Sequence, residues 1–295
     1  MGVLEISDLV VDRDAVTGAR RPVRRAEVVA RLRAAGDARG ARIVARMPVV
    51  GEHLDPVAVD RLLVRVHTEL QRLNEELHMA ERFAELLVPL LGAVRGVRPR
   101  LVDIGCGLGY LVRSLAASGV LGDVELVGVD FNRALVDEAS RLAAEEGLAC
   151  SFVCADAFSL REEAAVYVSS GVLHHFPAAD LPAFFRAQAG AQAFVHYDIA
   201  ATRLASFGAW LFHRARMREP LGRHDGVASA RRAHGDDVLL DAAGAADGMD
   251  VFLFESFKYA NPFCAAMRPV VGVQPALAVE FQRALGQRVR GLVRA

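Results

Sequence analysis

Cysteine pairs, lysine, tryptophan and long apolar runs are all scarce in this chain of 295 residues. The four cysteines include no C-x-x-C pair, which argues against a zinc site and favours reduced thiols. No uncharged apolar run reaches the roughly 18 residues that a membrane-spanning helix needs. Acidic residues interrupt the N-terminus, and no apolar segment of a secretory signal follows. We therefore expect a cytoplasmic protein.

A strong excess of either charge is also missing, because the formal net charge is −1. Such a chain has no global field that would attract nucleic acid or an anionic membrane, so we expect neither as a partner. The arginine-rich residues 20–25 are interpreted as a solvated face, since no aromatic residues interleave with them. Apolar material is abundant, and 53% hydrophobic residues suffice for a large domain with an appendage.

The most informative segment is residues 101–110, LVDIGCGLGY. An apolar run meets Asp103, and glycines follow at alternate positions, Gly105, Gly107 and Gly109. This pattern predicts a buried strand, a tight turn and the start of a helix, where backbone N–H groups face a polar ligand. The spacing D-x-G-x-G-x-G differs from the G-x-G-x-x-G pattern of dinucleotide-binding proteins.

Further apolar segments alternate with helical patterns along the chain. Residues 124–130 and 151–157 are predicted strands that each carry an acid at or near the end, and residues 165–176 are predicted to be a fourth strand that enters a loop. Successive β-α units predict a parallel sheet with right-handed crossovers. A fifth strand is expected at residues 192–198, and two late strands at residues 251–257 and 264–273 are expected to form a closing hairpin.

These segments resemble class I S-adenosylmethionine (SAM) dependent methyltransferases. The resemblance is strong over residues 97–200 and weaker over residues 236–275. It implies an α/β fold with a Rossmann-like, doubly wound, mostly parallel seven-stranded sheet. It also implies SAM as the cofactor and S-adenosylhomocysteine as the product.

The resemblance further assigns cofactor-binding roles. The glycine loop is expected to hold the methionine part of SAM, with Asp103 near its amino group. Asp130 is expected to bind the ribose hydroxyls, and Asp156 the adenine amino group, with the Ala157 N–H at the ring. The full implied set is Asp103, Gly105, Gly107, Gly109, Asp130, Phe131, Asp156, Ala157 and Ser170.

Before the glycine loop, apolar residues from Leu63 to Val94 recur at alternating spacings of three and four. This places an apolar stripe on one helical face. We favour an amphipathic helical pair packed on the sheet domain, and a homodimer through the stripe is the alternative. The predicted domains are a helical cap over residues 1–96 and a SAM-binding domain over residues 97–295, with an insertion at about 200–235.

Methyl transfer to a hydroxyl needs a group that removes a proton, and histidine titrates near neutral pH. The loops at the carboxyl ends of the strands place four candidates near the acceptor: His174, His175, His213 and His224. A purely structural role for each histidine is the competing interpretation. No H-E-x-x-H or comparable spacing indicates a metal site, so none is predicted.

The sequence therefore predicts an enzyme that methylates a small, fairly apolar organic molecule, such as a secondary metabolite. O-methylation is favoured, while N- or C-methylation stays open. A cyclopropane synthase is another alternative within the same fold. A non-catalytic SAM-fold scaffold or regulator is the alternative from a different class, because fold alone does not fix function.

Overall fold

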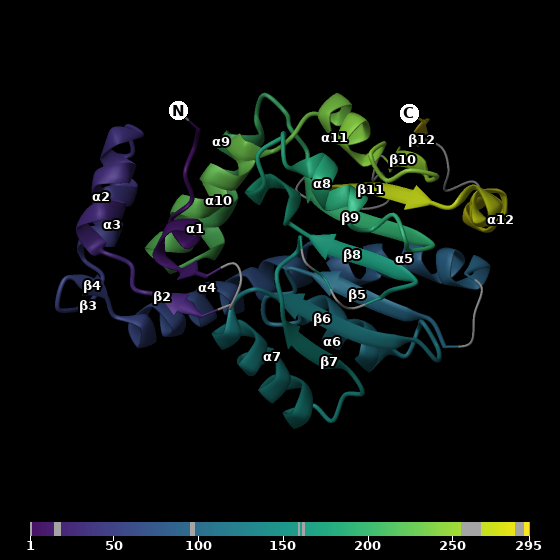
Figure 1. Cartoon of the computed structure of the whole chain (residues 1–295), viewed down its shortest axis with the longest axis horizontal. Helices are drawn as coiled ribbons and strands as arrows, with labels where there is room; N and C mark the ends of the chain where they lie inside the picture. The colour runs from purple at the N-terminus through teal and green to yellow at the C-terminus, as the bar shows by residue number, and fades with distance from the viewer. Residues whose placement is uncertain are drawn as a thin grey trace. The chain divides into compact units, whose positions relative to one another are not determined.

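The computed structural model describes residues 2–14, 19–94, 98–158, 160, 163–254 and 267–286, together with the backbone of 292–294. The chain divides into two compact units (Figure 1). The first unit comprises Met1–Leu73 and Thr202–Arg232, and the second comprises Asn74–Ala201 and Ala233–Ala295.

A mixed sheet forms the centre of the second unit, in the strand order β12-β10-β11-β9-β8-β5-β6-β7. Its strands are β5 (Arg100–Ile104), β6 (Glu125–Asp130), β7 (Ser151–Cys154), β8 (Val166–Ser170), β9 (Ala193–Ile199), β10 (Asp250–Phe254), β11 (Met267–Val273) and β12 (Leu292–Arg294). The run from β7 to β9 is parallel, whereas β11 is antiparallel to both β9 and β10. The predicted doubly wound, mostly parallel seven-stranded sheet is confirmed, and β12 adds an edge strand that we did not predict. Residues 255–266, which include the end of the first predicted late strand and the start of the second, lie outside the described residues.

Helices pack on this sheet through apolar faces. They are α5 (Met79–Ala93), α6 (Tyr110–Ser118), α7 (Arg133–Glu145), α8 (Leu181–Arg186), α11 (Asp236–Ala243) and α12 (Pro275–Leu285), with a 3₁₀ turn, η1, at Leu173–His175. Helix α7 starts at Asn132, whose side chain accepts the Ala134 N–H at 3.0 Å. Helices α8 and α11 cover one face of the sheet, where Phe184 and Leu239 join Val102 in one apolar cluster.

The first unit is mainly helical, with two short hairpins. Its elements are α1 (Ile6–Val10), β1 (Asp12–Arg13), β2 (Arg20–Arg21), α2 (Arg25–Ala34), α3 (Ala38–Ala45), β3 (Val49–Val50), β4 (His53–Leu54), α4 (Pro56–Glu76), α9 (Ala205–Arg216) and α10 (Pro220–Arg232). Helix α10 contacts α1, α3 and α9. The Asp225 carboxylate accepts the Ile6 and Ser7 N–H groups at 2.9 and 2.8 Å, which ties α10 to the start of α1.

This division differs from the predicted border at residue 96, which itself falls on residues outside the described set. The apolar stripe forms two helices, α4 and α5, which separate at His78 with a left-handed φ of 53°. Helix α5 belongs to the second unit, because Phe83 is fully buried and packs edge-on against Tyr197 of β9 at 4.7 Å. The predicted insertion, in contrast, groups with the N-terminal residues of the first unit. No helix among the described residues is long and apolar enough to cross a membrane.

Candidate active site

The glycine loop joins β5 to α6 at the carboxyl edge of the sheet. Gly105, Gly107 and Gly109 have φ values of 69°, 55° and 70°, a region that side chains disfavour. A Cβ at Gly105 would lie 2.6 Å from Val172 Cγ2, and one at Gly109 would overlap the Phe152 ring. Glycine is therefore required for both the backbone conformation and the packing. The loop after β8, which contains Val172, lies directly against this turn.

Asp103 is buried beneath the loop and lacks a hydrogen bond at one oxygen. The residue is 3% exposed, and its Oδ1 atom has no partner among the described residues. Burial first, and then the charge of Asp130, raises the pKa of Asp103 well above its usual value. An unpartnered buried carboxylate oxygen is costly, and a ligand ammonium group would satisfy it. The methionine end of SAM carries such a group, so this residue fits the predicted cofactor.

Asp130 ends β6 and organises the same edge. Its Oδ2 accepts the Gly107 N–H at 2.9 Å, and its Oδ1 accepts the Asn132 N–H at 2.8 Å. Each carboxylate oxygen has a second acceptor position, so these bonds are compatible with the predicted ribose contacts. The next residue, Phe131, is 49% exposed and offers an apolar surface beside this carboxylate.

The adenine-binding residues were predicted in the turn after β7 and at the end of β8. Asp156 is exposed and its Oδ1 accepts the Phe158 N–H at 2.7 Å, which closes a tight turn. Ala157 and Ser170 are half-buried. Phe158 packs edge-on against Phe176 at 4.8 Å. The contacts of these residues with the cofactor stay predictions.

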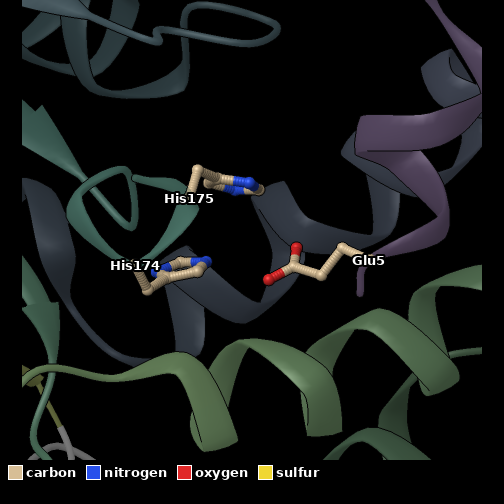
Figure 2. Close-up of side chains that lie close together, drawn as sticks. All are labelled: Glu5, His174 and His175. Atoms are coloured by element: carbon tan, nitrogen blue, oxygen red, sulfur yellow. The ribbon is translucent and has the colours of Figure 1, made fainter. Parts of the chain in front are cut away.

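His174 and His175 lie together on the turn η1 (Figure 2), with ring centroids 4.4 Å apart. Asp198 of β9 holds His174 twice: Oδ2 accepts its backbone N–H at 3.1 Å, and Oδ1 lies 2.7 Å from its Nδ1. Burial acts to raise the pKa of Asp198, but the charge and hydrogen bonds of His174 outweigh it and lower the pKa overall. An ionised Asp198 accepts a hydrogen bond from the Nδ1–H of His174, which assigns Nε2 as the basic nitrogen of the neutral ring.

The other two candidate histidines lie in the first unit. His224 bridges two carboxylates, with Nε2 2.6 Å from Asp37 and Nδ1 2.7 Å from Asp225. Burial disfavours the charged ring, but these two acids outweigh burial and raise the pKa of His224. His213 lies on α9 with Nδ1 2.8 Å from the Met217 sulfur, and burial lowers its pKa to about 4. Of the four candidates, His174 and His175 share one turn of the second unit, whereas His213 and His224 belong to the first unit.

Two buried polar residues of β9 were not among the predicted site residues. The predicted candidates included neither Asp198, which pairs with His174, nor His196. His196 is fully buried, with Nδ1 2.8 Å from Ser169 Oγ and Nε2 2.8 Å from Gln188 Oε1. The available signal was the alternation along this strand, because residues two apart share a face.

Comparisons with known proteins agree with this geometry. A family model described as a methyltransferase domain matches residues 101–191. No curated protein gave a match. Solved structures with a similar fold include the plantazolicin methyltransferase BpumL with bound S-adenosylhomocysteine, at TM-score 0.52 and 12% identity over 73% of this chain and 95% of that one. The plantazolicin methyltransferase BamL gives TM-score 0.50 and 16% identity over 73% and 96%.

Magnesium protoporphyrin IX methyltransferase from Synechocystis PCC 6803 gives TM-score 0.47 and 18% identity over 85% of this chain and 99% of that one. Residues 101–191 are thus similar to a methyltransferase domain, and the strand order of the sheet is that of the class I methyltransferase fold.

Proposed function

We propose that this protein transfers the methyl group of SAM to a hydroxyl of a small, fairly apolar organic molecule, with His174 as the general base. The observation that carries the proposal is the His174–Asp198 pair, held at 2.7 Å at the carboxyl edge of the sheet. The pair is linked to the glycine loop, because Val172, which contacts the Gly105 turn, lies two residues before His174.

One set of residues would bind the cofactor, and another would accept the proton of the acceptor hydroxyl. SAM supplies an electrophilic methyl group on a sulfonium. Asp103 would pair with the ammonium group, and the glycine loop admits the methionine part close to the backbone. Asp130 would bind the ribose hydroxyls, and Asp156 would accept from the adenine amino group. These residues fix the orientation that in-line displacement requires.

The acceptor hydroxyl would lose its proton to His174 Nε2 and gain the methyl group on its oxygen. Asp198 would stabilise the imidazolium that forms and hold the ring in the required tautomer. The His175 ring lies tilted against this ring, with centroids 4.4 Å apart, and would limit its rotation. An apolar acceptor is supported by the exposed aromatic side chains of the same edge, Phe131 and Phe158.

Calorimetry with S-adenosylhomocysteine tests the cofactor part, and a screen of phenols, alcohols and amines with SAM tests the reaction. His174→Gln should bind S-adenosylhomocysteine normally but lose about 10²–10⁴-fold in turnover of a hydroxyl acceptor. His175→Gln is the matched neighbour and should lose much less. Absence of S-adenosylhomocysteine binding would refute the proposal. Normal turnover by His174→Gln would remove the base and favour an acceptor that needs no deprotonation, such as a neutral amine.

A further inference from the structure

The helix α9 carries an apolar patch that no part of its own unit buries. The patch consists of Leu204, Phe207, Trp210 and Leu211, with exposed fractions of 72%, 62%, 44% and 49%. The spacings of three, four and seven place these side chains on one helical face, and the Phe207 and Trp210 rings stack at 6.0 Å. None of the twelve residues of α9 is buried. Short helices usually depend on packing of an apolar face, so this face fits a surface outside the unit.

The charged residues around the patch are all positive. Residues 199–218 contain four arginines and no aspartate or glutamate, although the whole chain is nearly neutral. Arg203 and Arg214 are exposed and lie just before and just after the patch along the same helical face. The overall net charge of −1 therefore conceals a local cationic and apolar segment.

We propose that α9 docks on an anionic phospholipid surface, with the patch entering the headgroup region and Arg203 and Arg214 pairing with phosphates. Tryptophan, phenylalanine and leucine on one face, flanked by arginine, are the composition of helices that lie in a membrane interface. A convex helical row suits a planar surface better than a small ligand, which needs a concave site. Pairing with a second copy through α9 would bring four arginines of each copy together without an acid in this segment to compensate.

The chain contains its own reporter, because Trp210 is its only tryptophan. The full-length protein is titrated with vesicles of phosphatidylglycerol or of phosphatidylcholine while tryptophan emission is recorded. We expect a blue shift and protection from aqueous quenchers with phosphatidylglycerol only, and loss of both at about 1 M salt, where charges are screened within a few ångströms. Sedimentation with the vesicles should follow the same curve.

Two variants separate the charged and apolar contributions. Arg203→Gln with Arg214→Gln should weaken vesicle binding about 30-fold, because each arginine near an anionic surface contributes about fivefold. Phe207→Ser with Leu211→Ser should weaken it at least about tenfold. Val279→Ser, which removes a side chain of α12 that is 66% exposed, is the matched control and should bind like the wild type.

Unchanged emission and no sedimentation with phosphatidylglycerol vesicles would overturn the proposal. Equal binding to phosphatidylcholine would overturn its anionic part. A blue shift that grows with protein concentration without vesicles, together with a dimer mass in light scattering, would assign the patch to a second copy instead. The proposal does not rest on the methyltransferase activity, so each of these outcomes leaves that activity untouched.

Discussion

His196 in the second unit and the half-buried His224 in the first unit are each held by hydrogen bonds on both ring nitrogens, yet their pKa values are shifted in opposite directions. His196 in the second unit meets the Ser169 hydroxyl and the Gln188 amide, and burial lowers its pKa to about 3. His224 in the first unit meets Asp37 and Asp225, which raise its pKa despite burial. The charge of a partner, rather than burial alone, therefore decides whether a histidine is neutral or cationic.

His174 combines features of both. Like His224 it contacts a carboxylate, because Asp198 accepts its backbone N–H at 3.1 Å and lies 2.7 Å from its Nδ1. The arrangement orients the ring and assigns the proton to Nδ1, which suits a general base.

The largest expected effect comes from breaking the Asp198 contact. Asp198→Asn should reduce turnover about 10²–10⁴-fold, because the amide can impose the wrong tautomer on His174. The loss should shrink at high pH, where a hydroxyl acceptor ionises unaided. Steady-state rates across pH measure both effects. Asp225→Asn, the matched change in the His224 network, should leave the shape of that pH profile unaltered; the same change of shape in both variants would contradict a role for Asp198 in positioning His174.

The second effect concerns acid stability and His196. Its pKa is about 3 in the folded protein and about 6.5 when unfolded, so the stability it contributes is present above pH 6.5 and is lost as pH falls toward 3. The expected slope is about 1.4 kcal/mol per pH unit. Urea unfolding at pH 7 and pH 5 should show this slope in the wild type and a smaller one in His196→Phe with Ser169→Ala, which removes the imidazole and one of its two polar partners. Equal slopes in the two proteins would show that His196 is not protonated on unfolding.

Much of the sheet could be predicted because its determinants are local. The apolar segments at residues 101–104 and 124–130, and the alternating glycines after the first of them, specify strands and a turn without reference to distant residues. The predicted sheet was therefore confirmed. The strand β12 was missed because its pairing with β10 is set by partners remote in sequence.

The division into units was harder to predict for the same reason. The stripe from Leu63 to Val94 is continuous in sequence, and nothing in its spacing shows that His78 adopts a left-handed conformation between α4 and α5. The association of residues 202–232 with the N-terminus depends on contacts such as Asp225 to Ile6, which span 219 positions. The same limit hid the pairing of Asp198 with His174, whereas the residue types of the glycine loop were visible at once.

Asp103 adds a further case, a buried carboxyl with one oxygen that has no hydrogen-bond partner among the described residues. Its pKa is raised in the folded protein, so its effect on stability is most favourable below the unfolded pKa and becomes unfavourable as pH rises through the folded value. Asp103→Asn should therefore raise the free energy of unfolding at neutral pH by about 1–3 kcal/mol and weaken SAM binding by a similar amount. Wild-type affinity should rise with pH, since binding an ammonium group requires the ionised acid.

Calorimetry and urea unfolding of the same samples check both halves of this prediction. Asp123→Asn, a change at an acid outside the glycine loop whose side chain is 84% exposed, is the control and should alter neither quantity by much. A variant at Asp103 that lost stability as well as affinity would show that its carboxylate has a structural partner.

The smallest expected effect is a loss of stability at alkaline pH that comes from His224 in the first unit. Because the pKa of His224 is raised, its contribution to stability is complete below about pH 6.5, the unfolded value, and is lost as pH rises through the folded value. This is the reverse of His196. His224→Gln should cost about 1 kcal/mol at pH 6 and less at pH 9, because hydrogen bonds to a charged group are lost only where the ring is charged. Unfolding measured at both pH values, with His53→Gln as a control histidine in the same unit, tests the sign. A larger cost at pH 9 than at pH 6 would mean that the two carboxylates hold a neutral ring, and the contrast between the two histidines would then rest on burial rather than on the charge of their partners.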